Sequence, residues 1–340
     1  MSDDDVDGLF PLYLGALGAL SLYWLTIPKP KPPDLTGKKV VITGANSGIG
    51  KGLTEVCALA GGHVIMAVRD TRLGTSIKHD LVNKYNNKKL IIDVEELDLQ
   101  SLDSIDSFVV SQSNVDILIN NAAVLQPKQT IYAAKNHLVE STMLTNYVGP
   151  FYLTMKLLPN LINSAKLNNS YSHIINVSSK LERNANVTLS NYRSIFNAKN
   201  DDYSCWDAYA NSKLLNILFT MELQKRLRPD SKVVVAAVTP GLVNTSLDRH
   251  MHSMQLTRYL TYPLKQIFLK SPENSALEII NLTGVTPRSD AGRDRDIIPY
   301  YSNLKAIKPG NAVFQEEKTN EKLAGEVFRY TMDLLGLKEE

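Results

Sequence analysis

The chain has 340 residues, of which 44% are hydrophobic and 21% are charged, so its length and composition fit one large globular domain with a sizeable core. Its formal net charge of +2 argues against a nucleic-acid binder that relies on phosphate contacts. The two cysteines are far apart and the six histidines form no ligand-like cluster, which argues against a disulfide framework and a histidine metal site. A reducing compartment is favoured.

The N-terminal region predicts a membrane anchor. After an acidic tail at 1–8, residues 9–27 contain no charged side chain, and as a helix they would span about 28 Å, close to the ~30 Å hydrocarbon core of a bilayer. Residues 28–35 form a stiff linker rich in Pro and Lys. Because Lys29 and Lys31 follow the apolar segment and no basic residue precedes it, we expect the main domain on the cytosolic side. A core helix, or insertion into one leaflet, are the alternatives.

From residue 36 to residue 340, apolar strands alternate with helical patterns. Such alternation predicts an α/β fold, with a single doubly wound Rossmann-type domain whose parallel sheet carries helices on both faces. The expected strands are 38–43, 63–68, 90–94, 115–120, 173–177 and 233–239, and the expected helices are 49–59, 102–110, 139–158 and 209–227.

A glycine-rich loop joins the first expected strand to the first expected helix. Its sequence is Thr43-Gly44-Ala45-Asn46-Ser47-Gly48-Ile49-Gly50. The glycines let the backbone turn tightly and approach a pyrophosphate, and the following helix offers free N–H groups to that anion. Between a strand and a helix, this loop predicts a dinucleotide site.

The end of the second strand bears on the choice of cofactor. Arg69 can pair with the 2′-phosphate of NADP, whereas an acidic residue such as Asp70 would bond the 2′-hydroxyl of NAD. Arg69 therefore favours NADP(H) over NAD. Ser47 adds no support, because a basic residue at that loop position would have strengthened the case. The alternative is that Arg69 is a solvated charge and Asp70 selects NAD.

A tyrosine followed four residues later by a lysine occurs at Tyr209/Lys213, and the same spacing recurs at Tyr85/Lys89, Tyr152/Lys156 and Tyr301/Lys305. Only the Tyr209 pair opens a helical pattern behind an apolar strand that ends in two serines, Ser178 and Ser179. Residues at i and i+4 share a helix face, so the ammonium of Lys213 can favour the phenolate of Tyr209. This pair predicts a hydride-transfer site with Tyr209 as the acid/base.

Together these motifs resemble the short-chain dehydrogenase/reductase superfamily over residues 36–335. Ala67–Asp70, Ser212–Phe219 and Tyr300–Ser302 are most similar to its retinol-dehydrogenase-like branch. Further likeness lies in Leu97-Asp98-Leu99, Asn120-Asn121-Ala122-Ala123, the segment around Asn146, and Pro240-Gly241-Leu242-Val243-Asn244-Thr245. The resemblance implies that the cofactor contacts Thr43, Gly44, Ser47, Gly48, Ile49, Gly50, Arg69, Asp98, Asn121, Tyr209, Lys213, Pro240, Gly241, Val243 and Thr245.

The resemblance also implies the catalytic roles. Ser179, preferred over Ser178, would orient the carbonyl oxygen, and Lys213 would hold the nicotinamide ribose beside Tyr209. Asn146 would hold a water that links Lys213 to solvent. Because thirty positions separate Ser179 from Tyr209, we expect the long segment Leu181–Asp207 to form part of the substrate-pocket rim.

The expected function is therefore that of a membrane-anchored oxidoreductase that moves a hydride between NADP(H) and the carbonyl or alcohol carbon of a lipophilic substrate, such as a retinoid, steroid or fatty aldehyde. The apolar run 251–268 is a candidate substrate lid. The expected cellular location is the endoplasmic reticulum membrane or a lipid droplet surface, with the catalytic domain facing the cytosol. A nucleotide-binding regulator or scaffold without turnover is the alternative, and a homo-oligomer is left open.

Overall fold

The computed structural model describes residues 30–86, 89–196, 203–241, 270–284, 299–315 and 317–338. The expected anchor at 9–27, the candidate lid at 251–268, and the site residues Val243 and Thr245 lie outside these ranges. Within them, none of the helices is both long enough and apolar enough to cross a membrane.

The core of the fold is an eight-stranded sheet of order β10-β9-β8-β7-β4-β1-β2-β3. All neighbouring strands pair parallel except β9 with β10. The strand order reverses between β1 and β4, which in such sheets opens a crevice beyond the carboxyl ends of the strands. The strands are β1 Lys39–Thr43, β2 His63–Val68, β3 Ile92–Glu96, β4 Ile117–Asn120, β7 Ser172–Val177, β8 Val233–Val238, β9 Tyr300–Ser302 and β10 Lys305–Ala306.

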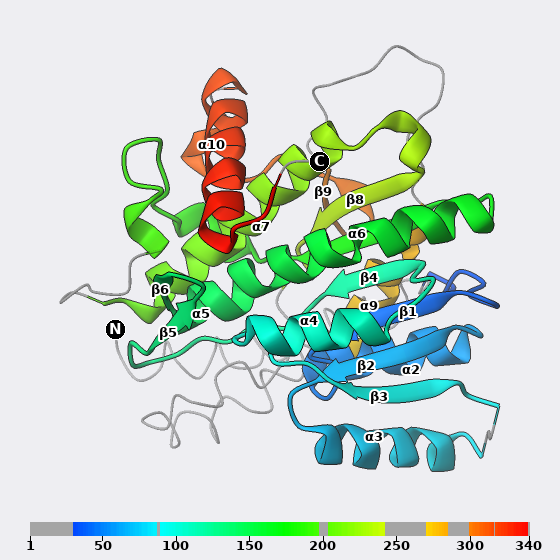
Figure 1. The fold of residues 1–340 in the computed structure, drawn as a ribbon. Coiled ribbons are helices and arrows are strands. Elements are labelled where there is room, and N and C mark those ends of the chain that lie inside the picture. Colours follow the sequence, from blue (N-terminus) through cyan, green and yellow to red (C-terminus); the bar gives the residue numbers. More distant parts are fainter. Residues whose placement is uncertain are drawn as a thin grey trace, which may run out of the picture.

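Helices cover both faces of the sheet because successive strand residues point to opposite sides. Val41 and Ile65 face one apolar cluster, which also contains residues of α4, α6, α7 and α10, whereas Val40 and Val64 face the other, with α2, α3 and α9. Figure 1 shows α4 and α6 before the sheet and α2 and α9 behind it. The helices are α2 Gly48–Leu59, α3 Thr71–Lys84, α4 Leu102–Ser111, α6 Gly149–Leu167, α7 Cys205–Arg226, α9 Pro272–Asn281 and α10 Glu317–Leu335.

The expected Rossmann-type sheet is confirmed, but one expected helix is wrong. The range 139–158 is divided into the end of strand β6 (His137–Glu140), a short helix α5 (Ser141–Met143), a π-helical turn at Leu144–Val148, and the first half of α6. Strand β6 pairs antiparallel with β5 (Ile131–Ala134) in a hairpin that had not been expected. Helices α3, α9 and α10 were also not expected.

Candidate active site

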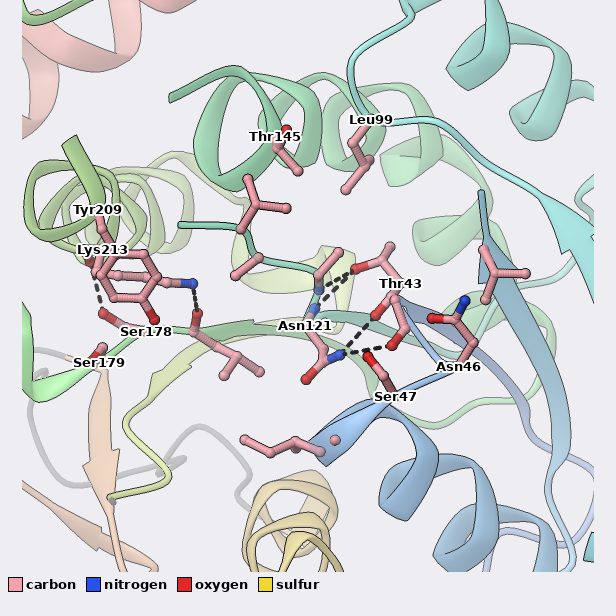
Figure 2. Close-up of a pocket in the computed structure, with 18 of the residues that line it drawn as sticks. Thr43, Asn46, Ser47, Leu99, Asn121, Thr145, Ser178, Ser179, Tyr209 and Lys213 are labelled. Carbon is pink, nitrogen blue, oxygen red and sulfur yellow. Dashed lines mark hydrogen bonds between the residues drawn. The ribbon is translucent and has the colours of Figure 1, made fainter. Parts of the chain in front are cut away.

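A cleft of about 720 Å³ lies beyond the carboxyl ends of the parallel strands. Figure 2 shows the glycine loop with Thr43 and Ser47 on one side of it and Tyr209, Lys213 and Ser179 on the other. A volume of this size is typical of small-molecule and cofactor sites, which span ~300–1,000 Å³. The sheet therefore places the two ends of the predicted site, far apart in sequence, around one cavity.

The glycine loop adopts the conformation that a pyrophosphate cradle needs. Gly44 and Gly48 have positive φ angles of 64° and 49°, which favour glycine. A Cβ on Gly50 would lie 2.2 Å from the carbonyl oxygen of Gly44, so only glycine allows this close approach of helix and loop. The loop residues Thr43, Gly44, Ser47, Gly48 and Ile49 all line the cleft.

Helix α2 begins in the cleft without a side-chain cap. Ser47 holds the N-cap position, yet its hydroxyl makes no capping hydrogen bond. By contrast, α3, α4, α7 and α9 are each capped by a side chain. The first N–H groups of α2 thus lack the usual internal acceptor, and such a helix N-terminus is suited to an anion. This arrangement fits the phosphates of a dinucleotide.

Thr43 ties the glycine loop to the loop that follows β4. Its hydroxyl oxygen accepts hydrogen bonds from the backbone N–H groups of Asn121 and Ala122, each at 3.0 Å. Asn121 returns the contact, because its Nδ2 donates to the carbonyl oxygen of Thr43 at 2.9 Å. Thr43 and Asn121 therefore shape the floor of the cleft, and both were predicted from the sequence.

The end of β2 presents an arginine to the cleft. Arg69 is exposed and lines the cavity, and within the described residues its guanidinium has no hydrogen-bonding or ion-pair partner. Asp70 is differently engaged, because it is the N-cap of α3 and its Oδ1 accepts from the N–H of Leu73 at 3.1 Å. The carboxylate is thus partly committed to the helix, whereas Arg69 is available to a ligand.

The catalytic candidates meet at the other end of the cleft. Helix α7 carries Tyr209 and Lys213 on one face, with side chains that are 5% and 2% exposed, and the ammonium nitrogen of Lys213 lies 5.5 Å from the centre of the Tyr209 ring. Lys213 Nζ also donates to the carbonyl oxygen of Val177 at 2.9 Å, at the end of β7. The Ser179 side chain lines the same cleft, and its hydroxyl acts on the Tyr209 phenol in the direction that lowers the pKa of that phenol. The long segment between Ser179 and Tyr209 does not separate them.

Burial shifts the pKa values of Tyr209 and Lys213 in opposite directions. It raises the pKa of Tyr209 to about 12, although the nearby Ser179 hydroxyl opposes the shift. It lowers the pKa of Lys213 to about 7, because the ammonium loses its hydration. The chain alone therefore keeps Tyr209 protonated at neutral pH, ready to donate a proton, and holds Lys213 close to its titration point.

The two adjacent serines have different contacts in the structure. The Ser178 hydroxyl is buried and donates to the backbone carbonyl of Lys213 at 2.7 Å, so it joins β7 to α7. The Ser179 hydroxyl faces the cleft beside Tyr209. This geometry favours Ser179 as the catalytic serine.

Asn146 lies in the π-helical turn and is 1% exposed. Its Oδ1 accepts from the N–H of Val124 at 2.8 Å, and its Nδ2 donates to the Val124 carbonyl at 2.9 Å and to Ser212 Oγ at 3.2 Å. Both N–H donors of the amide are thus used within the protein. Asn146 thus joins the loop after β4 to α7 at Ser212, the residue before Lys213. Its part in holding a water stays a prediction.

The other three Tyr/Lys pairs have different surroundings. Tyr152 and Lys156 both contact the carboxylate of Asp106, and Tyr85 hydrogen-bonds Glu55. Tyr301 and Lys305 lie on paired strands, β9 and β10. None of these residues lines the cleft, so the spacing alone does not define the site.

The cleft contains other predicted residues and some that were missed. Asp98, Pro240 and Gly241 line it, as expected. Leu181 and Arg183 line it too, and the part of the segment Leu181–Asp207 in the substrate-pocket rim stays a prediction. The individual side chains of that segment had not been predicted, since no motif marks them.

A Rossmann-type sheet, an uncapped glycine-loop helix, and a cleft lined by Ser179 and the buried Tyr209 and Lys213 are the features of an oxidoreductase that uses a nicotinamide cofactor. The match to the family described as short chain dehydrogenase covers residues 38–195. Human retinol dehydrogenase 13 is 32% identical over 316 residues, which cover 91% of this chain and 88% of the relative. The chain belongs to the short-chain dehydrogenase family, and within it to the retinol-dehydrogenase-like branch.

Two solved structures share the fold. A protein from Mycobacterium paratuberculosis, titled as putative and uncharacterized, has a TM-score of 0.63 at 26% identity and covers 90% of this chain and 96% of its own. A 3-ketoacyl-(acyl-carrier-protein) reductase from Brucella melitensis, solved with NADH, has a TM-score of 0.54 at 20% identity and covers 78% and 95%.

Proposed function

We propose that this protein is an NADP(H)-dependent oxidoreductase that interconverts the carbonyl and alcohol forms of a lipophilic substrate of the retinoid, steroid or fatty-aldehyde type. One observation carries the proposal: the Ser179 hydroxyl, the Tyr209 phenol and the Lys213 ammonium lie together at the end of β7, facing the glycine loop across one cleft. The names of the retinol dehydrogenase relatives support a lipophilic substrate.

The proposed proton chemistry follows from the protonation state of Tyr209. With its pKa raised to about 12 by burial, the phenol is protonated at neutral pH and can donate to a carbonyl oxygen as that oxygen becomes an alcohol. Ser179 would donate a second hydrogen bond to the same oxygen and so orient it. The nicotinamide, when bound, supplies or accepts the hydride. Lys213 has one hydrogen bond within the described residues, so further donors are left for a ribose hydroxyl.

The decisive experiment is a substrate panel with the full-length chain in detergent. Retinal, a steroid ketone and a long-chain aldehyde would be reduced with NADPH, and the matching alcohols oxidised with NADP. We expect turnover of at least one pair, and a fall of about 10²–10⁴-fold in Tyr209→Phe, which keeps the ring but loses the proton. NADPH binding in Tyr209→Phe should be unchanged. A protein that binds NADPH but reduces no carbonyl would instead be a nucleotide-binding scaffold.

The proposed preference for NADP(H) depends on Arg69. An arginine with no partner in the described residues can pair bidentately with the 2′-phosphate, and Asp70 is engaged in capping α3. We expect Arg69→Ala to weaken NADPH binding by roughly 10–100-fold, as the loss of one charge-assisted bond of ~1.5–3 kcal/mol implies, and to leave NADH binding unchanged. Fluorescence titration with both cofactors measures this. Equal losses for both cofactors would contradict the assignment.

We extend the proposal to location: residues 9–27 anchor the protein in the membrane of the endoplasmic reticulum or on lipid droplets, with the catalytic domain in the cytosol. The uncharged apolar run and the lysines that follow it support this. Alkaline carbonate should leave the full-length chain in the membrane pellet and release a chain that begins at residue 30. Asn186 lies in an Asn-x-Thr triplet and is exposed, so a glycosidase-sensitive mass shift would contradict a cytosolic domain.

A further inference from the structure

Ser179 begins a short 3-10 helix, Lys180–Asn184, that determines where its hydroxyl points. Ser179 is the N-cap of this helix: its Oγ accepts from the N–H of Leu181 at 3.3 Å, and its carbonyl accepts from the N–H of Glu182 at 3.0 Å. The direction of the hydroxyl toward Tyr209 therefore depends on the placement of this single turn. A turn this short has little intrinsic stability, so other contacts must fix it.

Glu182 supplies one such contact from inside the turn. Glu182 is only 1% exposed. Its two carboxylate oxygens accept hydrogen bonds from the backbone N–H groups of Gly310 at 2.8 Å and Asn311 at 3.1 Å. A buried carboxylate is unfavourable unless it is hydrogen-bonded, so these two bonds are required for the turn to stay where it is. They reach across 128 and 129 positions of sequence.

Asn311 makes the reciprocal contact. Its Nδ2 donates to the backbone carbonyls of Glu182 at 2.9 Å, Arg183 at 3.3 Å and Ala185 at 2.9 Å. Its Oδ1 accepts from the N–H of Val313 at 3.0 Å, which holds the amide in this orientation. One side chain thus serves the carbonyl groups at the end of the 3-10 helix, of which that of Glu182 also accepts from the N–H of Ala185 at 3.1 Å.

The segment that carries Asn311 is itself attached to the core. Phe314 is buried in the apolar cluster that also contains residues of α7 and α10, and the N–H of Ile307 donates to the carbonyl of Tyr300 at 2.8 Å. The same cluster packs against the helix that carries Tyr209. The turn that begins at Ser179 and the helix that carries Tyr209 are therefore both attached to this apolar cluster, the turn through the segment of Asn311 and the helix directly.

We propose that Glu182 and Asn311 are positioning residues that hold Ser179 against Tyr209, so that the C-terminal segment 307–315 is part of the active site although it contributes no reacting group. The inference rests on the function proposed above, in which Ser179 and Tyr209 act on one oxygen. A misplacement of about 1 Å in such a site lowers turnover by up to ~10²-fold.

The test compares Glu182→Gln, Asn311→Ala and Ser179→Ala, singly and as the pair Glu182→Gln with Ser179→Ala, in the full-length chain. The substrate is the best carbonyl/alcohol pair from the panel. We expect each positioning variant to lower kcat about tenfold while NADPH affinity changes less than about twofold. The pH at which alcohol oxidation rises should shift upward, as in Ser179→Ala, because the Ser179 hydroxyl, which lowers the pKa of Tyr209, no longer lies beside the phenol.

Two comparisons separate positioning from a general loss of structure. Glu55 is another buried carboxylate, bonded to Lys84 on the far side of the sheet from Ser179, so Glu55→Gln should leave kcat unchanged. On the Ser179→Ala background, Glu182→Gln should cause no further loss, because its effect passes through that hydroxyl. A further loss on that background, or wild-type kcat in both Glu182→Gln and Asn311→Ala, would overturn the inference.

The inference can fail independently of the proposed function. If the wild-type chain turns over no carbonyl, the proposed function is wrong. The contact between Glu182 and Asn311 is then tested by a measurement that needs no substrate. Hydrogen exchange should be faster at the amides of 181–185 in Glu182→Gln and Asn311→Ala than in the wild type, and unchanged in Glu55→Gln. Unchanged exchange in both positioning variants would show that the pair does not hold the turn.

Discussion

Lys213 lowers the stability of the fold in which it is proposed to act. Burial holds the pKa of its ammonium at about 7, against 10.5 for a solvent-exposed lysine, so the unfolded chain binds the proton more tightly than the folded chain does. The folded state therefore becomes more stable as the pH rises from about 7 to 10.5, where the unfolded chain gives up its proton. Below pH 7 the folded protein holds a buried charge without an acidic partner among the described residues.

We expect Lys213→Met to stabilise the protein and to abolish turnover. Removing the buried charge gains up to ~5 kcal/mol at pH 6, and the lost hydrogen bond to the Val177 carbonyl costs ~1–3 kcal/mol, which leaves a net gain of up to ~2–4 kcal/mol. Urea unfolding at pH 6 and pH 10 measures this gain, which should shrink at the higher pH. Lys156→Met, at an exposed ion pair with Asp106, should change stability by less than ~0.5 kcal/mol. A destabilised Lys213→Met at pH 6 would contradict the argument.

At the scale of elements, the sequence predicted the strands of the central parallel sheet well, apart from a two-residue shift from 90–94 to Ile92–Glu96, and helix interruptions poorly. Strand 63–68 was found with the expected bounds, because a short apolar run between turn residues has few other structures open to it. The expected helix 139–158 failed because a π-helical turn adds a residue without changing the composition, and because buried Val139 suits a strand as well as a helix. Local patterns report periodicity and cannot report where the hydrogen-bond register changes.

The same contrast holds for the candidate site. Tyr209 and Lys213 were predictable because they are four residues apart on one helix and follow a strand that ends in serines. Glu182 and Asn311 were not, because they are 129 positions apart and neither belongs to a motif. Contacts between distant loops arise from the tertiary fold and leave no periodic trace in the sequence.

The contact between loop and helix at Gly50 gives a prediction at this scale. In Gly50→Ala the Cβ would meet the Gly44 carbonyl oxygen at 2.2 Å and Asn121 Nδ2 at 2.7 Å, so helix α2 must move away from the loop. We expect NADPH affinity to fall by at least about tenfold and the free energy of unfolding by ~1–3 kcal/mol. Fluorescence titration and thermal unfolding test both. Gly284→Ala, where a Cβ meets no atom within 4 Å, is the control that should change neither.

At the scale of the whole molecule, the fold extends well beyond residues 38–195, the part that matches the short chain dehydrogenase description. That match ends at residue 195, yet α7, which carries Tyr209 and Lys213, and α10 share one apolar cluster with α4 and α6. Phe328 of α10 lies with its ring centre 5.1 Å from that of Phe151 and 6.1 Å from that of Phe219, and the guanidinium of Arg226 covers its face at 4.4 Å. The two halves of the chain should therefore unfold together.

We expect Phe328→Ala to destabilise the whole molecule by ~3–5 kcal/mol, because it empties the centre of a cluster to which both halves contribute. The near-UV circular dichroism signal, NADPH binding and the protection of α6 amides from hydrogen exchange should all be lost in one coincident transition at a lower Tm. Leu167→Ala, at a side chain that is 66% exposed at the end of α6, should leave the Tm within about 2 °C. If α10 were a separate appendage, Phe328→Ala would loosen residues 317–338 while residues 38–195 kept their wild-type transition, so the exchange rates in α6 decide between the two descriptions.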